Sequence, residues 1–333
     1  MRERSISVYF ARDVLKHAVS QGLDVVGLLR QNRISPRLLQ EDNARISIER
    51  FANLQVSTML AMRDEFLGYA SQRMPIGSWS MMCHAVIGSD TLGQALHRYC
   101  RFFQLFEFGV RPHLEFSEGS VHIVAKPFDA AIPAPLYSAD TVLFNSHRFS
   151  SWLVQESLPL QAVHMIGPPR GPASDYRHMF LAAPTLFDQA DSRLTFSQTL
   201  LNKRVTQNEQ SLRHFLRHPV LIMLTQGYSQ SSWTMQVKNI IRHNLEIMPE
   251  LNEVAAQLAI HPQTLRRRLS SEGTNFKEIK NQLRRDTALH FLGKQGLSIE
   301  EIAYRAGFSE ASAFIRAFKG WTGLTPYTYR KGL

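Results

Sequence analysis

Residues 307–330 read GFSEASAFIRAFKGWTGLTPYTYR, and this stretch predicts a short helix over 309–319. A helix turns by about 100° per residue, so the spacing of the apolar residues places them on one side. That predicted buried side carries Ala311, Phe314, Ala317 and Phe318. The opposite side is polar and basic, with Ser309, Ser312, Arg316 and Lys319. The helix is therefore expected to pack on one face and to present the other to a partner.

The residues before this helix complete a motif, and the motif occurs twice. LSIEEIAYRAG (297–307) predicts a preceding helix that ends in a tight turn at Gly307. The same order appears in MPELNEVAAQLAIHPQTLRRRLSSEG (248–273), which has a break at 259–262 and a second helix over 263–271. A helix, a tight turn and a second helix form the motif that proteins insert into the DNA major groove.

In the first copy, Leu265 and Leu269 are predicted to face inward. The outward side of that helix carries Gln263, Arg267, Ser270 and Ser271. Arginine can bond bidentately to guanine, and Ser and Gln can reach base edges. Other basic residues are better placed for phosphates, which give affinity without sequence information. These are Arg266, Arg268, Lys294, Arg305 and Lys319.

An amphipathic helix over 275–296 joins the two copies. If it holds the two recognition helices about 34 Å apart, they enter successive major-groove segments on one face of the duplex. One exposed arginine is usually only a solvated charge. Two such motifs in tandem, each with an outward arginine, favour DNA binding.

The charge distribution agrees with this assignment. The chain has 333 residues and a net charge of +10. Residues 232–333 hold 15 Lys and Arg against 9 Asp and Glu, whereas the other residues hold 23 against 19. Over half of the excess positive charge thus lies in the last third of the chain, as expected for a domain that binds a polyanion.

The preceding two-thirds predict a different architecture, an α+β domain over 1–225. Helical periodicity predicts helices over 8–70 and a further helix that begins after a cap at Asp90. Alternating residues then predict a β-hairpin over 110–128. Further elements are a helix over 136–156, strands over 161–166 and 193–196, a loop over 168–176 and a helix over 208–226. The polar segment QGYSQSSWT (226–234) is the predicted linker to an all-α domain over 235–333, which contains two helix-turn-helix units and a linker helix.

The C-terminal stretch closely resembles the signature of the AraC/XylS family of bacterial transcription regulators. The resemblance covers about 235–331 and rests on Gly307, Phe308, Ser309, Ser312, Phe314, Arg316, Phe318, Lys319, Gly323, Thr325, Pro326, Tyr329 and Arg330, with Pro326 starting a final helix. It implies that bases are read by Gln263, Arg266, Arg267, Glu310, Ala311, Ser312 and Arg316. Independently of the resemblance, we assign phosphate contacts to Arg268, Lys294, Arg305, Ser309 and Lys319. His261-Pro262 departs from the family pattern at the start of the first recognition helix, and Ala311 offers only apolar contact.

The N-terminal part resembles the arabinose-binding-like domain of a branch of this family that includes regulators of ornithine use and of mycobacterial virulence. The similar stretches are 87–109 and 175–196. The resemblance implies a domain that senses a small molecule, dimerises, or does both. The aromatic residues Tyr99, Phe102, Phe103 and Phe106 are either core or the lining of an effector pocket, and both interpretations stay open.

Several other classes of protein receive no support. No run of about 18 apolar residues predicts a membrane span, and no apolar segment near the N-terminus predicts a secretory signal. Two cysteines, Cys83 and Cys100, fit a reducing compartment, so we expect a cytoplasmic protein associated with the nucleoid. No phosphate-binding loop, nucleophile elbow or metal-ligand spacing occurs, so we expect no enzymatic activity, no cofactor and no metal.

These observations predict a sequence-specific transcription regulator, expected to be an activator, that responds to a small-molecule effector. Its expected partners are double-stranded promoter DNA, RNA polymerase, an effector and a second protomer. One alternative is a DNA-repair or other enzyme fused to a helix-turn-helix module. For alkyl transfer, however, Met82-Cys83-His84-Ala85 lacks the flanking proline and arginine of the repair motif. The other alternative is a regulator with no small-molecule ligand.

Overall fold

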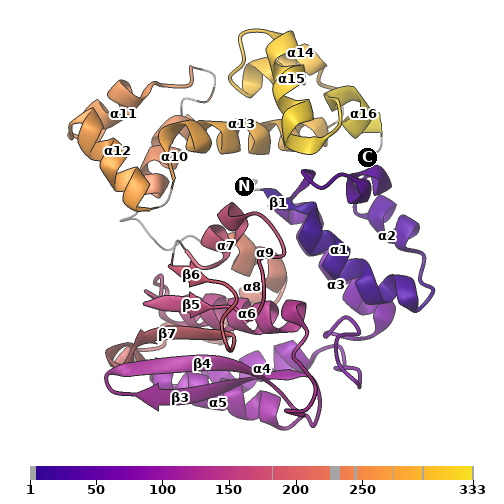
Figure 1. Ribbon diagram of the computed structural model, residues 1–333, viewed down its shortest axis with the longest axis vertical. Coiled ribbons are helices and arrows are strands. Elements are labelled where there is room, and N and C mark those ends of the chain that lie inside the picture. Colours follow the sequence, from indigo (N-terminus) through magenta and orange to yellow (C-terminus); the bar gives the residue numbers. More distant parts are fainter. Residues whose placement is uncertain are drawn as a thin grey trace. The chain divides into compact units, whose positions relative to one another are not determined.

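The computed structural model describes residues 5–181, 183–225, 233–243, 245, 247–272, 274–294 and 296–331. Contacts divide the chain into two compact units (Figure 1). Unit 1 takes in 1–11, 26–51 and 229–333, and unit 2 takes in 12–25 and 52–228. The predicted fold class is confirmed: a sheet-containing N-terminal part is followed by a helical C-terminal part with two helix-turn-helix units.

Unit 2 is built on a five-stranded sheet with the strand order β3-β4-β7-β5-β6. The strands are β3 (Val110–Ser117), β4 (Ser120–Pro127), β5 (Ala162–His164), β6 (Thr185–Leu186) and β7 (Arg193–Ser197). The predicted hairpin is confirmed: β3 and β4 pair antiparallel, with Phe116 opposite Val121 and Gly119 at positive φ in the turn. Among the described strands of this sheet, only β5 and β6 pair in parallel.

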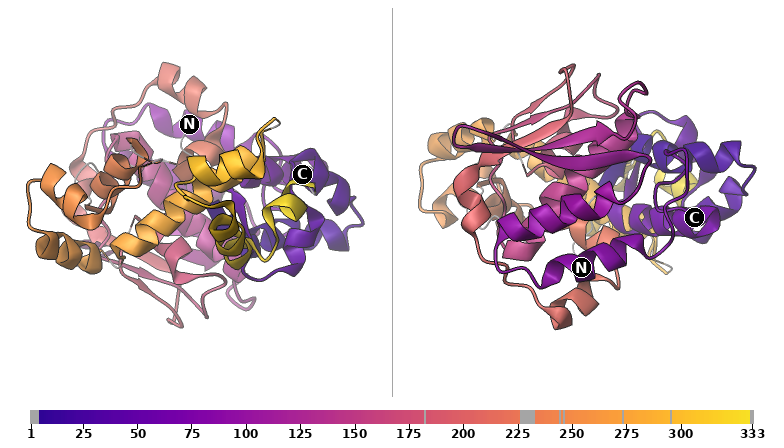
Figure 2. Two further views of the ribbon diagram at one scale, coloured as in Figure 1. Left: turned by 90° about the horizontal axis from the view of Figure 1, so that it is seen from above. Right: turned by 90° about the horizontal axis from the view of Figure 1, so that it is seen from below.

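The helices of unit 2 pack on this sheet or on one another and complete the core. They are α4 (Ser78–Ile87), α5 (Leu92–Gln104), α6 (Leu136–Val154), α7 (Ala173–Met179), α8 (Glu209–Phe215) and α9 (Pro219–Thr225), with a 3-10 turn, η2 (Gln198–Asn202). α5 packs on β3, and α6 packs on β3, β4 and β7 (Figure 2). Ile123 and Phe196 of the sheet are fully buried, so the apolar residues of the strands meet the apolar stripes of the helices.

Three local predictions in unit 2 were wrong. Thr91, not Asp90, caps α5: its hydroxyl accepts the backbone N–H of Gln94 at 3.3 Å. The predicted loop over 168–176 turns helical from Ala173. The single helix predicted over 208–226 is two helices, because Pro219 has no N–H to continue α8 and instead opens α9.

A buried histidine in α6 makes the stability of unit 2 depend on pH. His147 is fully buried, its Nε2 donates to the Leu158 carbonyl at 2.9 Å, and burial lowers its pKa to about 3. In the unfolded chain the pKa is near 6.5, so only the unfolded state gains a proton as the pH falls from 6.5 toward 3. We expect His147 to lower the free energy of unfolding by about 2 kcal/mol between pH 6.5 and pH 5.

Urea unfolding at several pH values, compared with a His147→Gln variant, measures this contribution. Glutamine can still donate an N–H to the Leu158 carbonyl but does not titrate. The other titrating groups are common to both proteins, so their effect cancels in the comparison. Equal pH slopes for the two proteins would show that the imidazole makes no such contribution.

Residues 5–62 are divided between the two units, and their helices are α1 (Val8–Ser20), α2 (Val25–Gln31), a 3-10 turn η1 (Pro36–Gln40) and α3 (Ile48–Met62). The sequence did not predict the two short strands here, β1 (Ser5–Ser7) and β2 (Arg45–Ser47), which pair antiparallel. Within unit 1, both strands contact α13 (Phe276–Leu292). The Nε groups of Arg45 and Arg285 donate to the Ser5 hydroxyl at 3.1 and 3.2 Å.

The C-terminal helices of unit 1 form two small lobes on α13. The first lobe contains α10 (Trp233–His243), α11 (Leu251–Gln257) and α12 (Pro262–Ser271), and the second contains α14 (Ile299–Arg305), α15 (Ala311–Thr322) and α16 (Pro326–Lys331). The predicted final helix starting at Pro326 is therefore confirmed. Residues 226–232 of the predicted linker lie outside the described residues, and residues 233–234 begin α10.

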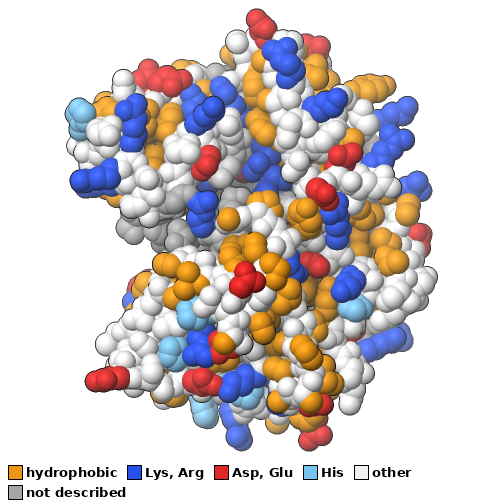
Figure 3. Space-filling model, viewed as in Figure 1, with side chains coloured by type: hydrophobic (Ala, Val, Ile, Leu, Met, Phe, Trp, Pro, Cys, Tyr) orange, Lys and Arg blue, Asp and Glu red, His pale blue; other side chains and the backbone are white. Residues whose placement is uncertain are grey.

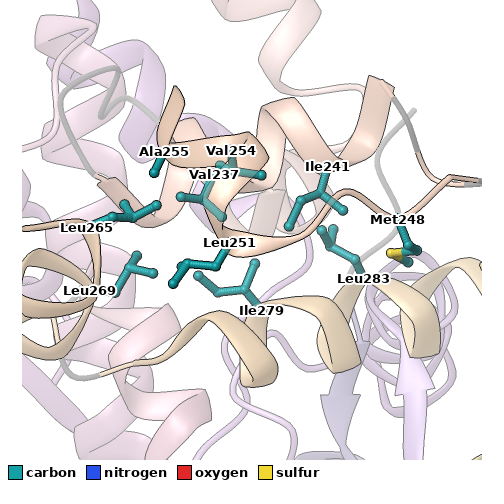
Figure 4. Packing of buried hydrophobic residues seen from close by; sticks show 10 residues of the cluster. All are labelled: Val237, Ile241, Met248, Leu251, Val254, Ala255, Leu265, Leu269, Ile279 and Leu283. Carbon is teal, nitrogen blue, oxygen red and sulfur yellow. The ribbon is translucent and has the colours of Figure 1, made fainter. Parts of the chain in front are cut away.

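One apolar core holds the first lobe to α13. Ile279 and Leu283 of α13 meet Leu265 and Leu269 of α12 and residues of α10 and α11 (Figure 4). Farther along α13, Ala288, Leu289 and Leu292 are buried where this helix contacts α14, α15 and α16. A single helix thus serves as a wall of both lobes.

Candidate nucleic-acid interface

The two helix-turn-helix units have the same turn. After α11, the N–H of Ala259 bonds the Ala256 carbonyl and the N–H of Ile260 bonds the Ala255 carbonyl. After α14, Gly307 and Phe308 make the corresponding bonds to Tyr304 and Ala303. Ala259 and Gly307 both have positive φ, at 53° and 77°. The twofold pattern of the sequence is therefore also a twofold repeat of backbone geometry.

In the first unit, α12 presents the side that the sequence analysis assigned to bases. It begins at Pro262, one residue earlier than expected, with the His261 ring accepting the N–H of Gln263 at 3.2 Å. Leu265 and Leu269 are fully buried, whereas Gln263, Arg266 and Arg267 are exposed. Arg266 donates to the Gln263 amide oxygen at 3.2 Å. For Arg267, the described residues supply no such partner.

In the second unit, α15 begins at Ala311, two residues later than expected. Ser309 and Glu310 precede the helix, and Glu310 occupies its N-cap position. The Ser312 hydroxyl donates to the Glu310 carboxylate at 3.1 Å. Phe314 and Phe318 are fully buried, and Ser312, Arg316 and Lys319 are exposed on the other side. Ala311 is half-buried and offers only a methyl group.

The side chains assigned to phosphates differ in their exposure and in their contacts with aromatic rings. Arg268 is half-buried and stacks over Trp233 at 4.0 Å. Lys294 and Arg305 are exposed, and both lie over the Phe291 ring, at 5.4 and 5.1 Å. Ser309 and Lys319 are exposed. Lys and Arg side chains, with some acidic ones among them, lie over the surface of these helices (Figure 3).

Arg284 of α13, which no sequence pattern singled out, supports the second turn. Its Nη2 donates to the Gly307 carbonyl at 3.0 Å, and its guanidinium lies over the Phe308 ring at 4.8 Å. Burial lowers the pKa of this arginine. Gly307 itself has no room for a side chain, because a Cβ there would lie 2.8 Å from the Leu245 carbonyl oxygen. The only sequence signal for this contact is the position of Arg284 around α13, on the side that would have to face the turn at Gly307.

Unit 2 contains a cavity, and the four aromatic residues singled out from the sequence divide around it. Tyr99 and Phe103 line the cavity, whereas Phe102 and Phe106 are not among its lining residues and lie edge to face at 5.5 Å. The cysteines Cys83 and Cys100 are buried. Burial raises the pKa of Cys100 to about 12 and that of Cys83 well above its usual range. Both are protonated thiols at neutral pH and therefore weak nucleophiles.

The described residues hold no group of three or more His, Cys, Asp or Glu side chains suited to a metal ion. None of the helices within them is both long and apolar enough to cross a membrane.

Comparison with known proteins identifies both parts of the chain. Residues 22–205, more than half of the chain, match the model of the arabinose-binding domain of AraC transcription regulators. Residues 254–332 match a helix-turn-helix domain model. The fold and the two exposed helix faces define a DNA-binding regulator with an N-terminal ligand-binding domain. The chain belongs to the AraC family of transcription regulators.

Individual relatives agree with this family. The ornithine utilization regulator of Pseudomonas aeruginosa is 24% identical over 98% of this chain and 96% of its own length. The regulator VirS of Mycobacterium tuberculosis is 42% identical over 23% of each chain. Among solved structures, the regulator CdpR of P. aeruginosa is 21% identical, with 97% of this chain and 98% of that chain covered and a TM-score of 0.29. The two domain matches and the sequence relatives confirm the predicted family, including its ornithine-utilisation branch.

Proposed function

We propose that this regulator reads promoter DNA with the exposed sides of α12 and α15 and that a small molecule bound in unit 2 changes its activity. Base contacts are assigned to Gln263, Arg266, Arg267, Glu310, Ala311, Ser312 and Arg316. Phosphate contacts are assigned to Arg268, Lys294, Arg305, Ser309 and Lys319. The observation that carries the proposal is the exposed arginine at the same side of two geometrically equivalent units, Arg267 and Arg316.

The geometry supports a specific kind of target site. Two recognition helices mounted on one rigid helix, α13, suit two half-sites about 10–10.5 base pairs apart on one face of the duplex. Arg267 and Arg316 are suited to guanines in these half-sites, because the guanidinium can bond O6 and N7 together. The stacked cations Lys294 and Arg305 are suited to the backbone, where position along the strand matters more than base identity.

Selection of bound sequences from a random duplex pool by the full chain tests this proposal. We expect enrichment of two short motifs with that spacing, and an affinity that falls steeply as salt rises because counterions are released. Enrichment of no sequence over the starting pool, with salt-dependent binding to every duplex, would leave only non-specific binding and would contradict the proposal.

Further parts of the proposal concern partners and place of action. We infer that the regulator works in the cytoplasm at the nucleoid, forms a homodimer, contacts RNA polymerase and activates transcription, with no catalytic reaction of its own. The high pKa values of Cys83 and Cys100 support the last point, because an alkyl-accepting cysteine needs a thiolate. Transcription in vitro with purified RNA polymerase, with and without the regulator, measures the direction of the effect.

A further inference from the structure

The cavity in unit 2 has walls of aromatic rings. Its volume is about 100 Å³, which is room for roughly seven to ten water-sized atoms. The aromatic lining comprises Phe66, Tyr69, Trp79, Tyr99, Phe103 and Tyr137. Tyr69 and Tyr137 stack with their centroids 4.6 Å apart, and Trp79 meets Tyr99 edge to face at 6.5 Å. These rings come from the segment after α3 and from α4, α5 and α6, so the fold alone brings them together.

The charged groups of the lining have one sign. Glu65 is the charged residue of the lining. The described residues that line the cavity include no Lys, Arg or His. The three lining tyrosines stay neutral, because burial raises the pKa of Tyr69, Tyr99 and Tyr137 above the usual value. An anionic ligand would therefore enter a poorly solvated space that holds a like charge and no basic partner, which is strongly unfavourable.

The carboxylate of Glu65 is held in place but not neutralised. Its two oxygens accept the backbone N–H groups of Gly77 and Trp79, at 2.7 and 2.8 Å, at the N-terminus of α4. A helix N-terminus supplies about half of an elementary positive charge. No basic side chain of the described residues makes an ion pair with Glu65, and each oxygen keeps a lone pair for a further donor. Burial raises the pKa of this carboxyl group, as expected when no cation compensates it.

We infer that the cavity binds a small organic cation, a protonated or quaternary amine with an apolar body of roughly seven to ten non-hydrogen atoms. Aromatic rings attract a cation that lies over their faces, and Glu65 supplies the opposite charge. The apolar body fills the space between the rings. This inference rests on the proposed function, since the cavity is the effector site proposed for unit 2, and it assigns the chemical class of that effector.

Three probes of nearly equal size and different charge test the inference on the full chain. They are phenethylamine, 2-phenylethanol and phenylacetate, with binding measured by titration calorimetry at pH 7.5. We expect phenethylamine to bind at least about tenfold more tightly than 2-phenylethanol, and phenylacetate to bind most weakly. The comparison uses the unaltered protein, so no variant has to fold for the result to count.

A Glu65→Gln variant then assigns the preference to the carboxylate. Glutamine keeps an acceptor for α4 but has no charge, so we expect the preference for amine over alcohol to fall at least about tenfold. Affinity for 2-phenylethanol, within about threefold of the original value, reports an intact cavity. The matched control is Glu118→Gln, which removes the same charge from the exposed turn between β3 and β4 and is expected to change nothing.

Three results would overturn the inference: no saturable binding of phenethylamine, equal or tighter binding of the alcohol or the carboxylate, or an unchanged preference in Glu65→Gln. None of these three results concerns sequence-specific DNA binding. The selection from a random duplex pool measures DNA binding in the absence of the three small molecules. Failure of the inferred ligand class is therefore distinguishable from failure of the proposed function.

Discussion

Replacing Arg267 and Arg316 together by alanine is expected to weaken binding to the selected DNA site by about 2 to 6 kcal/mol. Each bidentate contact with guanine contributes about 1 to 3 kcal/mol of discrimination. The two side chains lie on different recognition helices, α12 and α15, so the losses should add. Both guanidinium groups are exposed while Leu265 and Phe314 behind them are buried, so the substitutions should leave the fold intact.

Fluorescence anisotropy with the selected duplex and a scrambled duplex measures this effect. We expect the preference between the two duplexes to collapse, with much less change on the scrambled one. The matched control is Arg73→Ala, which removes the same charge from an exposed position in unit 2. If the double variant kept both its affinity and its preference, these two arginines would not be the base-contacting residues.

A Gly307→Ala substitution is expected to destabilise the second helix-turn-helix unit by about 2 kcal/mol or more. Gly307 has φ of 77°, a conformation that costs an L-residue about 1 to 2 kcal/mol. An added Cβ would also lie 2.8 Å from the Leu245 carbonyl oxygen and 2.4 Å from Cγ of Met248. The Met248 side chain is buried and Cγ lies close to its backbone, so it can yield only by changing rotamer. The backbone oxygen cannot move without shifting the segment before α11.

Calorimetric unfolding and DNA binding together measure this change. We expect a lower melting temperature and weaker binding, because the turn sets the direction of α15. The equivalent turn provides a reciprocal variant, Ala259→Gly. Alanine there already has φ of 53°, so glycine should relieve backbone strain and leave the stability equal or higher by up to about 1 kcal/mol. A Gly307→Ala protein as stable as the original would contradict this account of the turn.

Much of the fold could be predicted from local periodicity. The hairpin β3–β4 was predicted because side chains alternate along a strand with a period of two. The exposed side of α12 and α15 followed from helical phase, once Leu265, Leu269, Phe314 and Phe318 were taken as buried. The boundaries were less accurate, as at Thr91 and Pro219, because caps and breaks depend on one or two hydrogen bonds.

The sequence by itself therefore determined the class of protein, the two helix-turn-helix units and the side of each recognition helix that is exposed. These features repeat within a few residues, so neighbouring residues are enough to specify them. Only the tertiary structure decided that Arg284 holds the Gly307 carbonyl, that Ser5 meets Arg285 on α13, and that Glu65 lies among six aromatic rings. Those contacts join residues far apart in the chain, and no local period records which distant surfaces pack together.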